Sequence, residues 1–159
     1  MKYLFNPTGR LVIWTLSLLA VDQLFKAIIR NSMSYGDNIA VLPLFRLQLI
    51  QNNGIAFGMF NGHDGIILIV GGFIVFLLLV AAAVVRHNEP MVVPMALLLA
   101  GSLGNLIDRL RLGSVTDFIR VPHWPAFNMA DIFIAMGVGL ILLRYLFPKG
   151  LRLQESEGD

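Results

Sequence analysis

The strongest constraint in this sequence is a set of long stretches that carry almost no charge. Residues 66–85 and 91–107 contain no Asp, Glu, Lys or Arg, and residues 11–29 and 127–147 contain two each. A helix that crosses the hydrocarbon core of a membrane needs about 20 mainly apolar residues. The pattern therefore predicts an all-α membrane protein with four transmembrane helices, near 11–29, 66–85, 91–107 and 127–147.

Composition supports this fold class and excludes several functions. Only 14% of the residues are charged and 57% are hydrophobic, whereas a soluble domain carries about 25% charged residues. A net charge of +2 on so few charges does not indicate a nucleic-acid partner. The absence of cysteine excludes disulfides, thiolate metal sites and a cysteine nucleophile. His63, His87 and His123 lack the spacing of metal ligands, so we expect no metal or other cofactor.

The connecting segments sort onto two faces of the membrane. Four spans place both chain ends on one face and residues 30–65 and 108–126 on the other, within a single integral membrane domain that covers residues 1–159. Lysine and arginine are divided six against six between the faces, so the positive-inside rule does not orient the chain. Six of the seven aspartates lie on or toward the second face, namely Asp22, Asp37, Asp64, Asp108, Asp117 and Asp131.

The segment from residue 30 to residue 65 is long enough to hold structure of its own. Residues 45–49 alternate between apolar and polar side chains, which is typical of a strand. Asn53-Gly54 follows, a strong signal for a hairpin turn, and Ile55–Phe60 would then be the second strand. We expect a small β-hairpin or sheet at the membrane surface, on the same face as the aspartates.

Two groups of polar residues lie inside or at the end of the predicted spans. A lone charge inside a membrane costs about 2.5–3.5 kcal/mol or more, so such residues indicate function. Asp22 and Lys26 are four residues apart and share a helical face; they either neutralise each other or belong to a site. Asn105, Asp108 and Arg109 also share a face, and they form either a solvated helix end or part of a site.

Asp117 and Asp131 are two further candidates for chemistry. Asp117 lies in an apolar, strand-like run, and Asp131 occupies the third position of a helix that Asn128 would cap. Two carboxyl groups brought together in a low dielectric share a proton, so one can activate water while the other protonates the leaving group. A serine–lysine dyad would need Lys26 beside Ser102 or Ser114 and is less well supported.

The order of these residues along the chain resembles that of a known family. This is lipoprotein signal peptidase, also called signal peptidase II, a family of bacterial inner-membrane aspartyl proteases. The resemblance covers essentially the whole chain. Its motifs are Asp22 with Lys26, residues 52–57 (NNGIAF), 104–109 (GNLIDR), 113–119 (GSVTDFI) and 127–131 (FNMAD). The connection between Asp117 and Asp131 is short, which would trim the loop that shapes the substrate entrance.

The resemblance implies an activity and a set of site residues. Asp117 and Asp131 would be the catalytic pair of an aspartic endopeptidase. The residues that line or support the site would be Asn52, Gly54, Asn105, Asp108, Arg109, Asn128, Asp22 and Lys26. The substrate would be the signal peptide of a diacylglyceryl-modified prolipoprotein, cut just before the lipid-modified cysteine, and globomycin would be an inhibitor. Both termini would be cytoplasmic, with the site facing outward near the surface of the inner membrane.

Two other functions remain compatible with the residues alone. A small proton-coupled transporter component could use Asp22, Asp108 and Asp131 as a relay, although the sequence shows no paired inverted repeat. A non-catalytic scaffold could bind a partner helix through Gly71-Gly72 and residues 135–139, but that would leave the gathered aspartates without a role.

Overall fold

The structure is a computed structural model that describes residues 6–54 and 64–147. Its helices are α1 (Pro7–Ser32), α2 (Asp64–Val85), α3 (Val92–Leu112) and α4 (Met129–Leu146), with a short 3-10 helix, η2 (Glu89–Met91), before α3. All four α-helices are long and apolar enough to cross a membrane. The prediction of a helical membrane protein with four spans is therefore confirmed.

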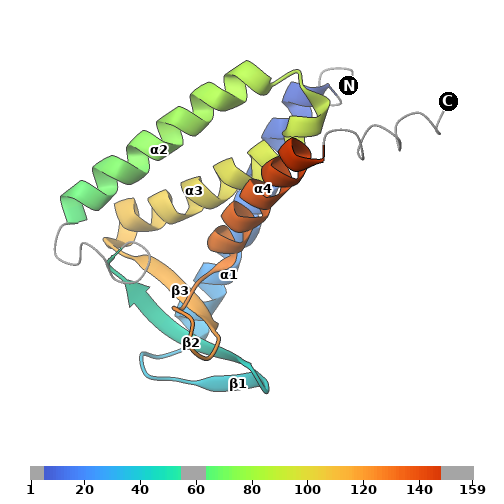
Figure 1. Ribbon diagram of the computed structural model, residues 1–159. Coiled ribbons are helices and arrows are strands. Elements are labelled where there is room, and N and C mark those ends of the chain that lie inside the picture. The colour runs from blue at the N-terminus through green and yellow to red at the C-terminus, as the bar shows by residue number, and fades with distance from the viewer. Residues whose placement is uncertain (1–5, 55–63, 148–159) are drawn as a thin grey trace.

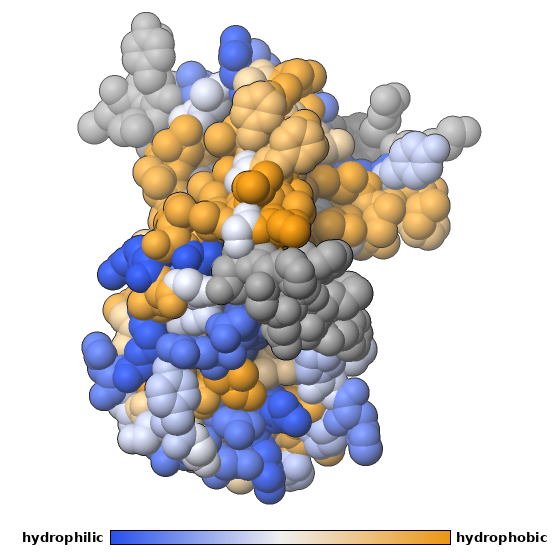
Figure 2. Space-filling view, turned by 90° about the vertical axis from the view of Figure 1, so that its left-hand side faces the viewer, coloured by the Kyte–Doolittle hydropathy of each residue, from blue (hydrophilic) through white to orange (hydrophobic). Residues whose placement is uncertain are grey.

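Helix α3 lies in the middle of the bundle and contacts each of the other three helices (Figure 1). In its most apolar part 56% of the residues are buried, against 17–22% in the other three helices. The outward faces of those helices are apolar, as Figure 2 shows for the upper part of the molecule. Because exposed apolar surface on this scale is unfavourable in water, these faces are suited to lipid.

Glycines allow α3 to approach its neighbours closely. A Cβ at Gly104 would lie 2.5 Å from Oδ2 of Asp22 in α1, and a Cβ at Gly101 would meet the backbone of Ala130 in α4. Small residues at helix contacts are typical of membrane bundles. The close approach brings polar side chains from three helices together at one end of α3.

The third helix is longer than its predicted span. The predicted span near 91–107 lies within α3, which continues to Leu112. It ends at Gly113, whose φ of 72° is the left-handed conformation that favours glycine. Asp108 and Arg109 therefore lie within a helix, on the same face as Asn105, as their spacing predicted.

A three-stranded antiparallel sheet covers the end of the bundle opposite the start of α1 and the end of α4 (Figure 1). Its order is β1 (Ile39–Leu42), β2 (Phe45–Asn52) and β3 (Val115–Arg120). The predicted strand at 45–49 is confirmed as part of β2, and the strand-like run around Asp117 is confirmed as β3. The predicted second hairpin strand, Ile55–Phe60, lies outside the described residues.

Strand β2 has two partners that the sequence did not indicate. Within the described part of the chain, β2 pairs with β1 and with β3, which comes more than sixty residues later in the chain. Strand β1 is four apolar residues without alternation, all exposed, so no period-2 pattern marks it. The pairing of β2 with β3 places Ile50 opposite Asp117 and Asn52 opposite Val115.

Candidate functional site

Asp117 is held on β3 by two amide side chains. Its side chain is almost completely buried, with 2% of the residue exposed. Nδ2 of Asn128 donates to Oδ1 at 2.7 Å, and Nδ2 of Asn52 donates to Oδ2 at 2.9 Å. Asn52 is itself oriented, because its Oδ1 accepts the backbone N–H of Gly54 at 3.0 Å. Both carboxylate oxygens of Asp117 therefore have a fixed donor.

Asp131 is held at the start of α4 by the local sequence. It forms a capping box with Asn128: the side chain of each residue accepts the backbone N–H of the other at 3.1 Å. Nδ2 of Asn105 in α3 also donates to Oδ1 of Asp131 at 2.8 Å. The predicted helix cap is confirmed. Asp131 is partly exposed, and each of its carboxylate oxygens accepts one hydrogen bond.

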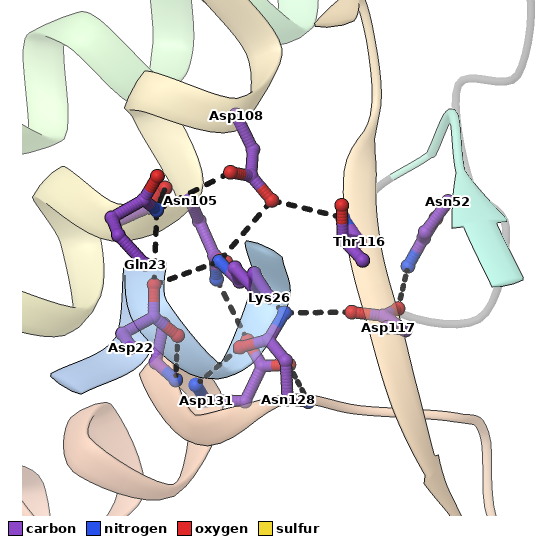
Figure 3. A network of polar contacts seen from close by, with 12 residues as sticks. Asp22, Gln23, Lys26, Asn52, Asn105, Asp108, Thr116, Asp117, Asn128 and Asp131 are labelled. Atoms are coloured by element: carbon purple, nitrogen blue, oxygen red, sulfur yellow. Dashed lines mark hydrogen bonds and ion pairs between the residues drawn. The ribbon is translucent and has the colours of Figure 1, made fainter. Parts of the chain in front are cut away.

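Asn128 connects the two aspartates (Figure 3). It is fully buried, caps α4 through Oδ1, and donates through Nδ2 to both Asp117 and Oδ1 of Asn105. The side chain that starts the helix thus also links β3 to α3. This link brings Asp117 and Asp131 to one place.

The surroundings of Asp117 change its acidity. Burial raises the pKa of Asp117 to about 6, because desolvation penalises the charged form. The hydrogen bonds from Asn52 and Asn128 and the charge of Lys26 oppose this rise, while the negative charge of Asp131 adds to it. The pair can therefore hold one proton at a pH where isolated aspartates would have lost both.

The two aspartates border a cavity of about 530 Å³. Its polar wall contains Asn52, Gly54, Asn105, Arg109, Asp117 and Asp131, and its apolar wall includes Gly71, Ile74, Leu106, Phe127 and Ile134. The apolar side chains come from helices α2, α3 and α4 and from the segment before α4. Arg109 is half-buried there and donates to the carbonyl of Gly54 at 3.1 Å. The cavity therefore joins an apolar region between helices to a pair of carboxyl groups.

Lys26 lies behind the polar wall in a closed ionic cluster (Figure 3). Its ammonium lies 3.0 Å from Oδ2 of Asp22 and 3.3 Å from Oδ2 of Asp108, and donates to Oδ1 of Asn105 at 2.9 Å. These three contacts use all three N–H donors of the lysine. Lys26 is thus unsuited to activate Ser102 or Ser114, and these contacts do not support the serine–lysine alternative. The structure also favours neutralisation over direct contact with the cavity for Asp22 and Lys26.

Sequence reasoning found most members of this hydrogen-bond network and missed four. Of the predicted site residues, six line the cavity, Asn128 links them, and Asp22, Lys26 and Asp108 form the cluster behind. The missed residues are Gln23, Arg30, Thr116 and Ala130. The alternation of β3 could have indicated Thr116 as the opposite-facing neighbour of Asp117. Ala130 takes part through its backbone, which no side-chain pattern reveals.

Comparison with known proteins places the chain among bacterial peptidases. A family model described as signal peptidase (SPase) II matches residues 14–147. The lipoprotein signal peptidase of Moorella thermoacetica is 36% identical over 85% of this chain and 91% of its own length. That of Acinetobacter baylyi is 37% identical over 98% of this chain and 94% of its own. A solved structure described as a bacterial membrane enzyme, at 2.3 Å, superposes with a TM-score of 0.81 at 33% identity, over 89% of this chain and 91% of its own.

Proposed function

The chain belongs to the signal peptidase II family, membrane proteases that process lipoprotein signal peptides, and we propose that it cleaves with Asp117 and Asp131 as its catalytic pair. The observation that carries this proposal is the cavity with both carboxyl groups on its polar wall. Every oxygen of the pair accepts a hydrogen bond from an amide or backbone donor. The pair is thus oriented while remaining free of a neutralising ion pair within the described residues.

The chemistry needs one shared proton. Close carboxyl groups in a low dielectric cannot both ionise, so one is protonated and the other charged. The charged member takes a proton from water as the water attacks the scissile carbonyl carbon. The protonated member gives its proton to the leaving nitrogen as the carbon–nitrogen bond breaks. Asn52, which lines the cavity beside Asp117, would orient the substrate backbone, and the fully buried Asn128 would hold Asp117 in place.

We propose that the substrate is the signal peptide of a diacylglyceryl-modified prolipoprotein, cut just before the modified cysteine. The apolar wall supplied by α2, α3 and α4 suits acyl chains, because burial contributes about 0.8 kcal/mol per methylene. The polar wall suits the peptide. A globomycin-type cyclic peptide would compete for the same cavity. The β2 segment that carries Asn52 would cradle the residues around the cleavage site.

The same arrangement supports a proposed location. Helix α1 begins and α4 ends at one end of the bundle, and the sheet, whose strand β3 carries Asp117, lies at the other (Figure 1). We propose that the chain ends are cytoplasmic and that the aspartates face outward in the bacterial inner membrane. Substrate would then enter sideways from the outer leaflet, and water from the membrane surface.

A proton-coupled transporter is less well supported. The relay would need Asp22, Asp108 and Asp131 to exchange protons along a path. Asp22 and Asp108 instead share the ammonium of Lys26 and are at most 1% exposed. Between Lys26 and Asp131 stands the amide of Asn105, which is a poor proton carrier because its nitrogen does not titrate at ordinary pH.

The test is cleavage by the purified chain in detergent micelles. One peptide carries the diacylglyceryl group on its cysteine, and a matched peptide carries free cysteine. We expect the lipid-modified peptide to be cleaved before the cysteine, also in the presence of a chelator, and the matched peptide to be cleaved far more slowly. Asp117→Asn and Asp131→Asn should each cleave about 10²–10⁴-fold more slowly. Near-normal cleavage by either variant would exclude the aspartate pair.

A further inference from the structure

The closed ionic cluster behind the cavity makes two matching contacts with the backbone. We call Asp22, Lys26 and Asp108 the buried bridge. Oδ1 of Asp22 accepts the backbone N–H of Ala130 at 2.9 Å, and Oδ2 of Asp108 accepts the backbone N–H of Thr116 at 3.0 Å. Ala130 directly precedes Asp131, and Thr116 directly precedes Asp117. Each carboxylate of the buried bridge therefore holds the residue next to one member of the aspartate pair.

We propose that the buried bridge is a spacer that sets the separation and orientation of Asp117 and Asp131. Asp22, Lys26 and Asp108 would then be positioning residues, which act on the reaction through the backbone of β3 and of the first turn of α4. This inference rests on the proposed function, since it assigns the spacing a task in catalysis. It deepens that function by naming what fixes the geometry of the pair.

The buried bridge has the rigidity that a spacer requires. The side chains of its three residues are at most 2% exposed, so water does not weaken their attraction as it does at a surface. A single ammonium contacts both carboxylates, which limits how far the two can separate. Nε2 of Gln23 lies 3.2 Å from Oδ2 of Asp22 and from Oδ1 of Asp108 and provides a second connection between them.

Two further contacts extend the buried bridge to the pair. Oδ1 of Asn105 accepts from Lys26 and from Asn128, so the amide nitrogen of Asn105 must point the other way, toward Asp131. On the β3 side, Arg30 donates to Oγ1 of Thr116 at 2.9 Å. Thr116 is thus held through both its backbone and its side chain.

The buried bridge acts from outside the cavity. Successive side chains of a strand point to opposite faces, so Thr116 faces the bridge while Asp117 faces the cavity. None of the three bridge residues is among those that line the cavity. A change in the bridge should therefore alter the rate of the chemical step and leave substrate binding nearly unchanged. A purely structural role would instead change stability alone.

The sharpest test removes one backbone N–H without changing any side chain. The α-hydroxy acid analogue of Ala130 or of Thr116 is introduced in the full chain. It replaces the peptide bond that precedes the residue by an ester, which lacks the N–H group. The charged groups around Asp117, namely Lys26, Arg109 and Asp131, all stay in place. The matched control is the same exchange at Leu142, an exposed residue of α4 that lies about 16 Å along the helix from Asp131.

We expect each ester to lower kcat roughly tenfold or more, because misplacing a catalytic group by about 1 Å costs on the order of a hundredfold. KM should stay within about threefold of that of the Leu142 control. The two limbs of the pH profile of kcat should also move closer together, because carboxyl groups that are farther apart perturb each other less. All rates are measured well below the unfolding temperature of each protein.

Two results would overturn the spacer. One is a kcat within about threefold of the Leu142 control for both esters, and the other is a loss of activity that only follows the folded fraction. Asp22→Ala and Asp108→Ala provide a side-chain version of the test. If those variants do not fold, the two esters alone decide the outcome. If the unmodified chain cleaves, Asp117→Asn does not, and both esters cleave normally, the spacer fails while the proposed function stands. If Asp117→Asn cleaves normally, the proposed function fails first.

Discussion

Two pairs of aspartates meet at the same end of α3, and they are held in different ways. Asp22 and Asp108 share the ammonium of Lys26 and are sealed from solvent. Asp117 and Asp131 are held by amide and backbone donors and border a cavity of about 530 Å³. Within the described residues, neither member of this second pair forms an ion pair.

The difference shows how one residue type serves two purposes. A carboxylate that is balanced by an ammonium has little reason to exchange a proton, and breaking such a buried pair is strongly destabilising. A carboxyl group held by neutral donors keeps its orientation without a counter-ion, so its protonation state can change. The first pair is therefore suited to hold the structure and the second to move protons. Substitutions should separate the two pairs by stability and by activity.

The largest expected effect is on activity and belongs to the second pair. Asp131→Asn should lower the rate of cleavage by about 10²–10⁴-fold, the usual contribution of a general acid or base. Its unfolding in mixed micelles should change far less, because an asparagine can still accept from Asn128 at the start of α4. A variant that unfolds readily but cleaves well when folded would reverse the comparison.

The next effect is on stability and belongs to the first pair. Lys26→Met leaves the buried Asp22 without its ammonium and leaves Asp108 with only the partly exposed guanidinium of Arg30, 3.9 Å away. We expect the free energy of unfolding to fall by about 3–5 kcal/mol. Adding Asp22→Asn and Asp108→Asn should recover part of that loss. Thr15→Val, which removes a buried hydroxyl elsewhere in α1, is the control and should change stability far less. Equal unfolding of Lys26→Met and Thr15→Val would contradict the prediction.

A smaller effect tests how closely α3 must approach the first pair. Gly104→Ala would place a Cβ 2.5 Å from Oδ2 of Asp22, and overpacking of this kind typically costs about 1–3 kcal/mol. Gly72→Ala and Gly139→Ala are matched controls, because a Cβ at either position meets nothing within 4 Å. We expect denaturant titration to show a loss only for Gly104→Ala; a similar loss in all three variants would show that the close approach is unimportant.

The smallest effect is a shift in the pH profile. The proton shared by the pair is lost as the pH rises through the pKa of Asp117, about 6, so activity should fall there. Asn52 donates to Oδ2 of Asp117 and favours its charged form. Asn52→Ala should therefore raise this pKa and move the limb to higher pH. Asn53→Ala, at the exposed neighbouring position, should leave the limb in place; a shift toward lower pH in Asn52→Ala would contradict the assignment.

The same pKa predicts the sign of the pH dependence of stability. Because the pKa of Asp117 is raised from 3.8 to about 6, the native chain binds a proton over that interval that the unfolded chain has lost. The contribution of Asp117 to stability is therefore fully present below pH 3.8 and is lost as the pH rises through about 6. Asp117→Asn should remove this component from the unfolding profile.

Local patterns in the sequence were sufficient for the helices and for the cap of α4. Spans of about 20 apolar residues require helices in lipid, because every backbone polar group must be satisfied within the segment. Asn128 and Asp131 are three residues apart, so their capping box is also local. The same reasoning placed Asp117 on a strand and Asp22 with Lys26 on one helical face.

The contacts that turn these residues into a site join distant parts of the chain. Asp22 meets the backbone of Ala130 across 108 positions, and Asn52 meets Asp117 across 65. Such pairings depend on which helices lie side by side and on the register of β2 against β3, and neither is a periodic property of one segment. The sequence alone therefore determined the membrane fold and the residues able to do chemistry. Only the tertiary structure decided which aspartates are neutralised and which face the cavity, because packing sets the neighbours of each charge.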